Sequence, residues 1–559
     1  MGRLVQKVEK GLSSRFARIF GDTFTLTFFF LIIILPILFI FTFVGTEWNS
    51  IYTTIFNHPI TGDEQWFDLT TALLRSFQIA GIVTIIDVLI GLPMALILAR
   101  YNFRGKKYID TLIDLPLAVP TAALGFSIYL FWGTQFGIGG LFGLESGLFS
   151  EGPLLIMLVH IVFTYPYIVR NLKEVIMRVD RTYENAAQSL GASKFTVFRT
   201  ITAPLMKEGL VAGAILAFTR SLGETGATMI VFGVTETSPI QIVAWRGLGL
   251  FGPAAFLTMI LVLVALGLLI LLKLITRRVG LPIHRIFPKV ERKLSHPIVR
   301  KSRNYIIGLI FLIVVILPSL WTFVYIGING EAVYTQTFLS SDNKVAAFWL
   351  SFMSSLSIAG MVTIICIILG IPMALIMVRR KWGKIKSLLD AMIDIPLVIP
   401  SAALGFSVFV FWGTLGPFGP DGLFSPGYWL IVLVHVVFCY PYMVRVLIPI
   451  ISKIDPGYEE AARTLGAPSF TVFRTCTWPL LKRGVIAGSI ITFTRSLGET
   501  GATLVVMGLA RTVPVLIVDW VEAQSLAAAA FASAFIVIFS FILIFILRKI
   551  TLAKEEEVR

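Results

Sequence analysis

Two copies of one ten-residue segment hold the charged residues that most need an explanation. The segment Thr-Arg-Ser-Leu-Gly-Glu-Thr-Gly-Ala-Thr occupies positions 219–228 and returns unchanged at 494–503. Both copies lie in apolar runs, where a charged side chain is costly unless it is paired or functional. The arginine and the glutamate are four residues apart in each copy, so they share one face of a helix. The candidate pathway residues are Arg220, Glu224, Thr225, Arg495, Glu499 and Thr500.

Two kinds of chemistry suit this pattern. The first is an internal ion pair, which holds each helix in place and is the usual way for a charge to survive in an apolar medium. The second is anion binding, which requires both arginines to lie near a common axis. The small residues around them favour close helix packing and fit either alternative.

A second duplicated segment is polar. Of the 21 positions from 184 to 204, 14 are identical in the copy at 459–479. Glu and Ala favour a helix at its start, and Gly191 or Gly466 permits a sharp turn before a second helix. Two short helices held at an angle form a rigid docking shape. The alternative is an amphipathic connector that lies on lipid.

The composition indicates the medium that surrounds these segments. The chain has 559 residues, of which 56% are hydrophobic and only 14% are charged, and its mean hydropathy is +0.86. This balance excludes a soluble globular protein, a disordered chain and a disulfide-stapled secreted fold. The three cysteines have no close neighbours in sequence, which argues against a disulfide framework or a Cys-x-x-Cys metal site. We therefore expect an all-α integral membrane protein.

Apolar runs long enough to cross a bilayer predict about twelve transmembrane helices. An even six in each half makes the two halves parallel repeats, related by a pseudo-two-fold axis along the membrane normal. The expected spans are 23–44, 70–99, 108–133, 152–176, 208–234, 253–276, 304–326, 347–378, 388–413, 428–450, 483–509 and 524–548.

The net charge of +15 follows from the same topology. With the N-terminus in the cytoplasm, 41 of the 47 Lys and Arg residues fall on the cytoplasmic side. That bias fixes the orientation by the positive-inside rule and places both termini in the cytoplasm. No nucleic-acid partner is needed to explain the charge. The four basic residues expected outside are Arg75, Arg246, Lys344 and Arg511.

Other matching segments divide the chain into two similar halves. The run Gly-Leu-Pro-Met-Ala-Leu-Ile at 91–97 has its counterpart at 370–376. We expect the first half to cover 1–285 and the second to cover 286–559. The longest outward loop has about 25 residues, too few for a folded ligand-capturing domain, so any capture protein is expected to be a separate chain.

The polar segments resemble the coupling loop of ABC importer permeases. The pattern Glu-x-Ala-Ala-x-x-x-Gly, followed by Phe and Pro, is similar to that of the binding-protein-dependent, type I group with the MetI-like fold. We call the segments near 177–207 and 452–482 the coupling loops. Asn185 and Glu460 stand where the usual pattern has Ala. The residues that the resemblance assigns to coupling are Glu184, Ala187, Gly191, Glu459, Ala462 and Gly466.

This resemblance implies partners and a location. Two coupling loops imply two cytoplasmic ATP-binding cassette subunits, and a solute-binding protein is expected outside. The chain has no Gly-x-x-x-x-Gly-Lys-Ser/Thr phosphate loop. ATP and Mg²⁺ are therefore expected on the partners, with no cofactor and no enzymatic activity in this chain. The expected location is the plasma membrane of a prokaryote.

Three solute-transport hypotheses follow. The segment at 219–228 resembles the matching part of sulfate and molybdate/tungstate permeases, and its Gly-Glu-Thr that of phosphate permeases, which implies an inorganic oxyanion. The fusion of two halves resembles the ferric-iron and thiamine branches of the family. A transporter driven by an ion gradient is the alternative from another class; it would need titratable residues at the midplane but not two matched loops.

The other polar residues in the apolar runs have structural interpretations. His160 and His435, one in each half, are predicted to be hydrogen-bonded core residues, because one histidine without carboxylates or thiols is a poor metal site. Asp87, whose matching position holds a cysteine, is expected to make a local hydrogen bond. Asp114 and Asp394 precede a Leu/Ile-Pro break in both copies, which indicates a kink or a gate.

Overall fold

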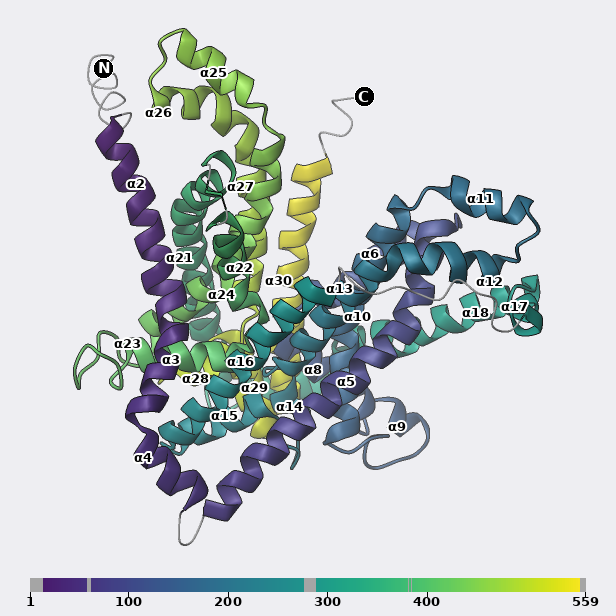
Figure 1. Ribbon diagram of the computed structural model, residues 1–559. Helices are drawn as coiled ribbons and strands as arrows, with labels where there is room; N and C mark the ends of the chain where they lie inside the picture. Colours follow the sequence, from purple (N-terminus) through teal and green to yellow (C-terminus); the bar gives the residue numbers. More distant parts are fainter. Residues whose placement is uncertain (1–13, 58–61, 276–287, 381, 384, 553–559) are drawn as a thin grey trace.

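The computed structural model describes residues 14–57, 62–275, 288–380, 382–383 and 385–552. Within this part of the chain every regular element is a helix, which confirms the all-α prediction (Figure 1). Elements labelled η are π-helical segments, in which one extra residue widens a turn.

The first half contributes most of its residues to long helices joined by short turns. Its elements are α2 (Arg15–Phe28), η1 (Phe29–Ile34), α3 (Leu35–Thr46), α4 (Trp48–Ile51), η2 (Tyr52–Phe56), α5 (Gly62–Arg100), α6 (Lys106–Ile113), α7 (Leu115–Ala118), α8 (Thr121–Trp132), α9 (Ile138–Leu141), α10 (Pro153–Arg178), α11 (Arg181–Ser189), α12 (Lys194–Val197), η3 (Phe198–Thr202), α13 (Ala203–Leu222), α14 (Thr228–Val231), α15 (Ser238–Gly247) and α16 (Phe251–Ile275).

A short helix, α17 (Pro288–Leu294), precedes the second half, which repeats the same order. Its elements are α18 (Pro297–Ile310), η4 (Phe311–Ile316), α19 (Leu317–Ile328), α20 (Gly330–Phe338), α21 (Lys344–Arg379), α22 (Ile385–Val398), α23 (Ser401–Trp412), α24 (Tyr428–Lys453), α25 (Pro456–Thr464), α26 (Ser469–Val472), η5 (Phe473–Thr477), α27 (Trp478–Leu497), α28 (Gly501–Val506), α29 (Val513–Glu522) and α30 (Leu526–Leu552).

Nine helices in the described ranges are long and apolar enough to cross a membrane, and eleven if each of two bent pairs is one span. The remaining predicted span corresponds to α27, which carries Lys482, Arg483 and Arg495 and is therefore less apolar. The chain is thus a multi-pass membrane protein.

Two predicted spans, 108–133 and 388–413, are not straight. The helices on either side of the break meet at 108° in the first half and at 106° in the second. Proline causes the break, because it removes a backbone donor and forces the preceding residue into an extended conformation. Val119, just before Pro120, has that conformation, with φ −88° and ψ 137°.

An arginine on the neighbouring helix holds each bent pair. Arg170 of α10 binds Asp110 at 2.7 Å and Asp114 at 2.6 Å. Arg445 of α24 binds Asp390 at 2.6 Å and Asp394 at 2.7 Å. Both aspartates of each half lie on the limb before the bend, so the arginine ties that limb to the neighbouring helix.

The predicted spans 208–234 and 483–509 are wrong as continuous helices. The helix α13 ends at Leu222 and α27 ends at Leu497, and a non-helical turn then leads into α14 or α28. The duplicated Gly-Glu-Thr-Gly sequence forms this turn, because two glycines in five residues weaken a helix. We call residues 223–227 and 498–502 the axial breaks.

The first span of each half packs on the other half. The helices α2 and α3 contact α21 and α23, whereas α18 contacts α5 and α19 contacts α8. Figure 1 also shows that the two halves meet where α14, α15, α28 and α29 lie together. From there they diverge, so that the ends with α11 and with α25 point away from each other.

Glycine allows the closest of the contacts between helices, which gives a testable expectation. A Cβ on Gly125 would lie 2.8 Å from the Ala227 Cα, whereas a Cβ on Gly360 of α21 would meet nothing within 4 Å. We expect Gly125→Ala to lower the free energy of unfolding by about 1–3 kcal/mol through overpacking. Thermal unfolding of the purified protein in detergent measures this. Gly360→Ala is the control, and equal melting temperatures for the two variants would contradict the prediction.

Candidate coupling loops and axial site

The coupling loops are the helix, turn and helix that the sequence predicted. Asp180 caps α11 by accepting a hydrogen bond from the Thr182 backbone N–H at 2.9 Å and another from its hydroxyl. These bonds hold the pKa of Asp180 below its ordinary value. Gly191 and Gly466 have φ of +83° and +82°, a left-handed conformation that favours glycine.

The predicted alanines take part in the turn through their backbone. The Ala187 carbonyl accepts a hydrogen bond from the Ala192 N–H at 3.0 Å, and the Ala462 carbonyl accepts one from the Ala467 N–H at 3.1 Å. Such bonds satisfy carbonyls that the helix end leaves free. Small side chains here let the turn close tightly.

The leading glutamates face their own half rather than the outside. Glu184 binds Arg100 of α5 at 2.8 Å and accepts a hydrogen bond from the Thr202 hydroxyl at 2.8 Å. Glu459 binds Arg379 of α21 at 3.1 Å and Thr477 at 3.1 Å. These glutamates therefore anchor each loop to the second span of its half. The sequence analysis missed the arginines, although both end their helices at matching positions.

The outward face of each loop instead carries apolar side chains. Leu190 is 89% exposed and Leu465 is 88% exposed, and Tyr183 and Tyr458 are also largely exposed. The same apolar residues at the same positions of two polar loops mark a surface that fits a partner protein. Their repetition in the sequence was the signal that the analysis did not use.

We expect Glu184→Gln to loosen the first coupling loop, because the Arg100 guanidinium loses a charged partner. Amide hydrogen exchange of α11 should become about tenfold faster, as expected from the loss of one charge-assisted hydrogen bond. Glu460→Gln is the control, since Glu460 is exposed in the matching loop. Unchanged amide exchange in Glu184→Gln would show that the ion pair with Arg100 does not hold the first coupling loop.

The side chains of each axial break form hydrogen bonds with the backbone groups that the break leaves free. Glu224 accepts a hydrogen bond from the Ala227 N–H at 3.1 Å, and the Thr228 hydroxyl donates to the Glu224 carbonyl at 3.1 Å. Glu499 repeats this with the Ala502 N–H at 3.0 Å. These bonds matter because lipid offers no partner to a broken helix.

The two histidines hold the breaks from the side. His160 bonds the Ser221 hydroxyl at 2.8 Å and the Thr228 hydroxyl at 2.9 Å, so one ring ties α13 to α14 across the break. His435 bonds the matching Ser496 and Thr503 at 2.9 and 2.8 Å. The prediction of hydrogen-bonded core histidines is confirmed. Asp87 also makes the expected local bond, with the Thr164 hydroxyl at 2.5 Å.

The axial breaks of the two halves touch each other. A Cβ on Gly226 would lie 2.5 Å from the Thr500 Cβ, and one on Gly501 would lie 2.6 Å from the Thr225 Cβ. Both threonines are buried, at 0% and 1% exposure. The breaks also pack against the proline kink of the opposite half, where a Cβ on Gly498 would lie 3.1 Å from the Pro120 Cα. This mutual contact closes the interface between the halves.

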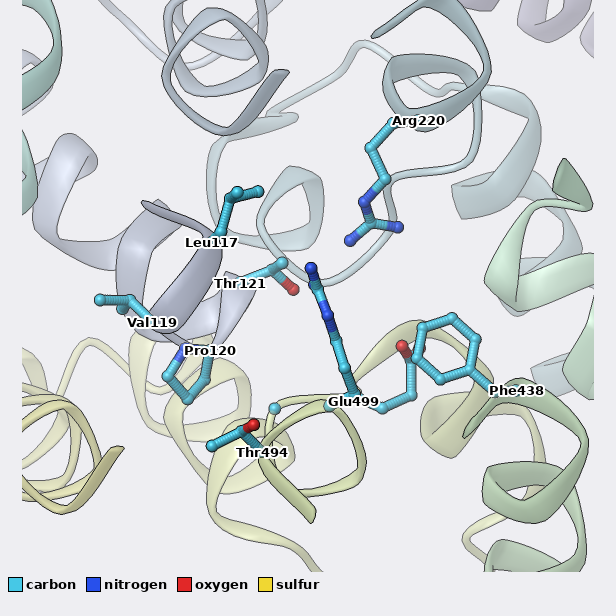
Figure 2. A pocket seen from close by; sticks show the side chains of 10 residues that line it. Leu117, Val119, Pro120, Thr121, Arg220, Phe438, Thr494 and Glu499 are labelled. Carbon is cyan, nitrogen blue, oxygen red and sulfur yellow. The ribbon is translucent and has the colours of Figure 1, made fainter. Parts of the chain in front are cut away.

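A small cavity lies beside this contact. It is lined by residues of both halves, including Thr121, Arg220, Arg495 and Glu499, and its volume is about 30 Å³. Figure 2 shows Arg220 and Thr121 from the first half and Glu499 from the second around it. By this measure one water molecule needs about 10–15 Å³, so the cavity has room for a few waters at most in this conformation.

The two arginines lie in one cavity but have different partners. Arg220 forms an ion pair with Glu224 at 2.8 Å, as the first alternative predicted. Arg495 lies over the Tyr442 ring, 5.3 Å from its centroid, and reaches the Tyr167 hydroxyl of the other half. Within the described ranges no carboxylate lies within 4.0 Å of the Arg495 side-chain nitrogens. The expected Arg495–Glu499 pair is thus not formed.

Comparison of the sequence with known proteins identifies a family and several relatives. The sequence model of the family described as "Binding-protein-dependent transport system inner membrane component" matches residues 88–281 and 366–552. A probable sulfate transport system permease protein of Chlorokybus atmophyticus is 33% identical over 223 residues, which cover 39% of this chain and 74% of the relative.

Two bacterial transport permeases are similar to this chain to about the same degree. The molybdenum transport system permease protein of Mycobacterium tuberculosis is 35% identical over 207 residues, covering 36% of this chain and 77% of the relative. The sulfate transport system permease protein of Salmonella typhimurium is 35% identical over 179 residues, covering 30% of this chain and 63% of the relative. Each alignment spans less than two fifths of this chain, as expected when one relative corresponds to one half.

Proposed function

We propose, for a chain that belongs to the family of binding-protein-dependent transport system inner membrane components, that both of its halves together form the permease of an ATP-driven importer for an inorganic oxyanion. The observation that carries this proposal is the cavity between the halves, where two arginines from matching positions face each other. A tetrahedral oxyanion such as molybdate or sulfate supplies the negative charge and the acceptor oxygens that guanidinium groups bind best.

The other substrates fit this cavity less well. Ferric iron carries positive charge and would be repelled by the two guanidinium groups. Thiamine is cationic and would be repelled in the same way. Three of the relatives described above are permeases for sulfate or molybdenum, which supports the oxyanion. The gradient-driven alternative is set aside, because the family is defined by its dependence on a binding protein.

In this proposal two cytoplasmic ATP-binding cassette subunits dock on the coupling loops, one on each. ATP and Mg²⁺ bind to those subunits and not to this chain, which acts as a transport subunit. The exposed Leu190 and Leu465 fit a hydrophobic groove, and Glu184 and Glu459, paired with Arg100 and Arg379, keep each loop at a fixed angle. The chain lies in the plasma membrane of a prokaryote with both termini in the cytoplasm, in agreement with its distribution of basic residues.

An extracytoplasmic solute-binding protein delivers the oxyanion at the opposite end. Two matching apolar side chains follow α14 and α28 there, and Val234 is 91% exposed while Leu509 is 97% exposed. Gly233 and Gly508 before them have positive φ, so tight turns hold these side chains outward. We assign this pair to the docking of the binding protein.

The halves meet at the axial breaks and diverge toward the coupling loops, which corresponds to an inward-facing arrangement. Transport then requires the coupling loops to approach each other and the axial breaks to separate. The oxyanion enters between the breaks and reaches Arg495, whose positive charge is not neutralised by a carboxylate of its own break. Arg220 contributes less, because Glu224 already occupies its guanidinium.

A pair of double variants tests the two docking surfaces against each other. We expect Leu190→Asp with Leu465→Asp to abolish association with the ATPase subunits, because each charge would be buried in an apolar contact. Val234→Asp with Leu509→Asp should abolish association with the binding protein alone. Each variant is the control for the other in a pull-down with both purified partners. ATPase binding that survives in the first variant would refute the coupling-loop assignment.

A second experiment tests the cavity. We expect Arg495→Gln to reduce molybdate and sulfate uptake into proteoliposomes by about tenfold or more, the effect of losing a charge-assisted hydrogen bond. The control is Arg220→Gln with Glu224→Gln, which removes the ion pair without leaving a buried charge unpaired. This control variant should lose less of the uptake activity than Arg495→Gln loses. Full uptake by Arg495→Gln would show that the arginine is structural.

A further inference from the structure

The helix that precedes the second half is bonded to the first coupling loop. Glu291 of α17 is only 4% exposed, and its carboxylate accepts hydrogen bonds from the Thr196 hydroxyl at 2.7 Å and from the Arg199 guanidinium at 3.0 Å. Thr196 lies in α12 and Arg199 follows in η3. A buried carboxylate with two such partners fixes the position of both segments, because leaving any of these groups unpaired would be costly.

A second contact lies one helical turn further along. The Ser295 hydroxyl accepts a hydrogen bond from the Phe195 backbone N–H at 2.9 Å and lies 2.9 Å from the Ser193 hydroxyl. The Phe195 N–H is one of the donors that the first turn of α12 leaves free. The chain between the halves thus caps the second helix of the first coupling loop. We call Glu291 and Ser295 the linker brace.

The linker brace continues directly into the second half. The helix α18 begins at Pro297, two residues after Ser295, and packs on α5 of the first half. Its extension α19 packs on α8, where the Ser127 hydroxyl donates to the Pro318 carbonyl at 2.7 Å and accepts from the Thr322 N–H at 3.0 Å. The helix α8 begins at Thr121, which lines the cavity between the halves.

The matching contact in the second half is built differently. The Ser407 hydroxyl bonds the Ala403 carbonyl of its own helix at 2.9 Å, and the position in α3 that matches Thr322 is Ile40. The packing of α3 on α23 is apolar there, with Phe39 against Phe411 at 5.2 Å. The polar bond between a first span and a cavity-lining helix is thus found at Ser127 and not at Ser407.

We propose that the linker brace positions the first coupling loop and transmits its movement, through α18 and α19, to the cavity-lining helix α8. This proposal rests on the assignment of the coupling loops above. Its physical basis is a set of buried and partly buried hydrogen bonds at Thr196 and at Ser127, joined by the packing of α18 on α5. The segment that carries the linker brace then takes part in the transport cycle, and it also joins the two halves. Glu291 acts through the loop, so it is a positioning residue.

The test measures oxyanion uptake for each ATP hydrolysed, in proteoliposomes with both partners present. We expect Glu291→Gln to reduce this ratio about tenfold, because the amide loses the negative charge and one of the two acceptor oxygens that hold Thr196 and Arg199, while ATPase subunits still bind. Arg292→Gln is the control, because Arg292 is exposed on the same helix. The exchanged pair Glu291→Arg with Arg199→Glu should restore most of the ratio, which a general loss of folding would not allow.

A double-mutant cycle tests the transmission itself. We expect Ser127→Ala to lower the same ratio and to add little to Glu291→Gln, since both interrupt one series of contacts. Fully additive effects would reject the route through α19. An unchanged ratio in Glu291→Gln would reject the linker brace. The pull-down with Leu190→Asp and Leu465→Asp decides the coupling-loop assignment separately, so the two failures can be told apart.

Discussion

Two apolar helices end at breaks that are buried between the halves, and the need to satisfy their backbone governs the rest of the structure. Lipid supplies no hydrogen bonds, so each axial break must provide its own. Glu224 and Glu499 do this by accepting backbone N–H bonds, and His160 and His435 tie the helices on both sides. The proposed anion site lies beside these breaks, where Arg220 and Arg495 line the same cavity.

The two halves repeat this plan but differ at the cavity between them. Arg220 is neutralised by its own glutamate, whereas Arg495 turns to aromatic residues and to the opposite half. The hydrogen bond between Asp87 and Thr164 in the first half has no polar counterpart, since Cys366 and Cys439 are free and buried. Halves joined in one chain can diverge in this way, because each always meets the same partner.

The exchange of first spans explains why the segment between the halves can have a mechanical role. Each first span packs on the opposite half, so the chain entering the second half must pass over the first. Glu291 and Ser295 hold it against the first coupling loop on the way. A loop movement is then shared between both halves, which differs from a symmetric assembly of two identical subunits.

Much of this was determined by the sequence alone. Apolar runs of bilayer length predicted the all-α membrane class, which the structure confirms; the orientation from Lys and Arg and the pathway residues of the repeat at 219–228 and 494–503 stay predictions. These features are local or periodic, so they survive without knowledge of contacts. The sequence predicted a break at Pro116 and Pro396, whereas the structure bends four residues later, at Pro120 and Pro400, and α22 continues through Pro396.

Only the tertiary structure decided which charges pair. The sequence places Glu224 and Glu499 in identical surroundings, yet only the first binds the arginine of its own helix. It likewise does not indicate that Glu184 turns inward to Arg100, or that Glu291 reaches Thr196 from about a hundred residues away. A side chain pairs with the polar groups that the packed helices place near it. Which groups these are is defined only when both halves are folded together.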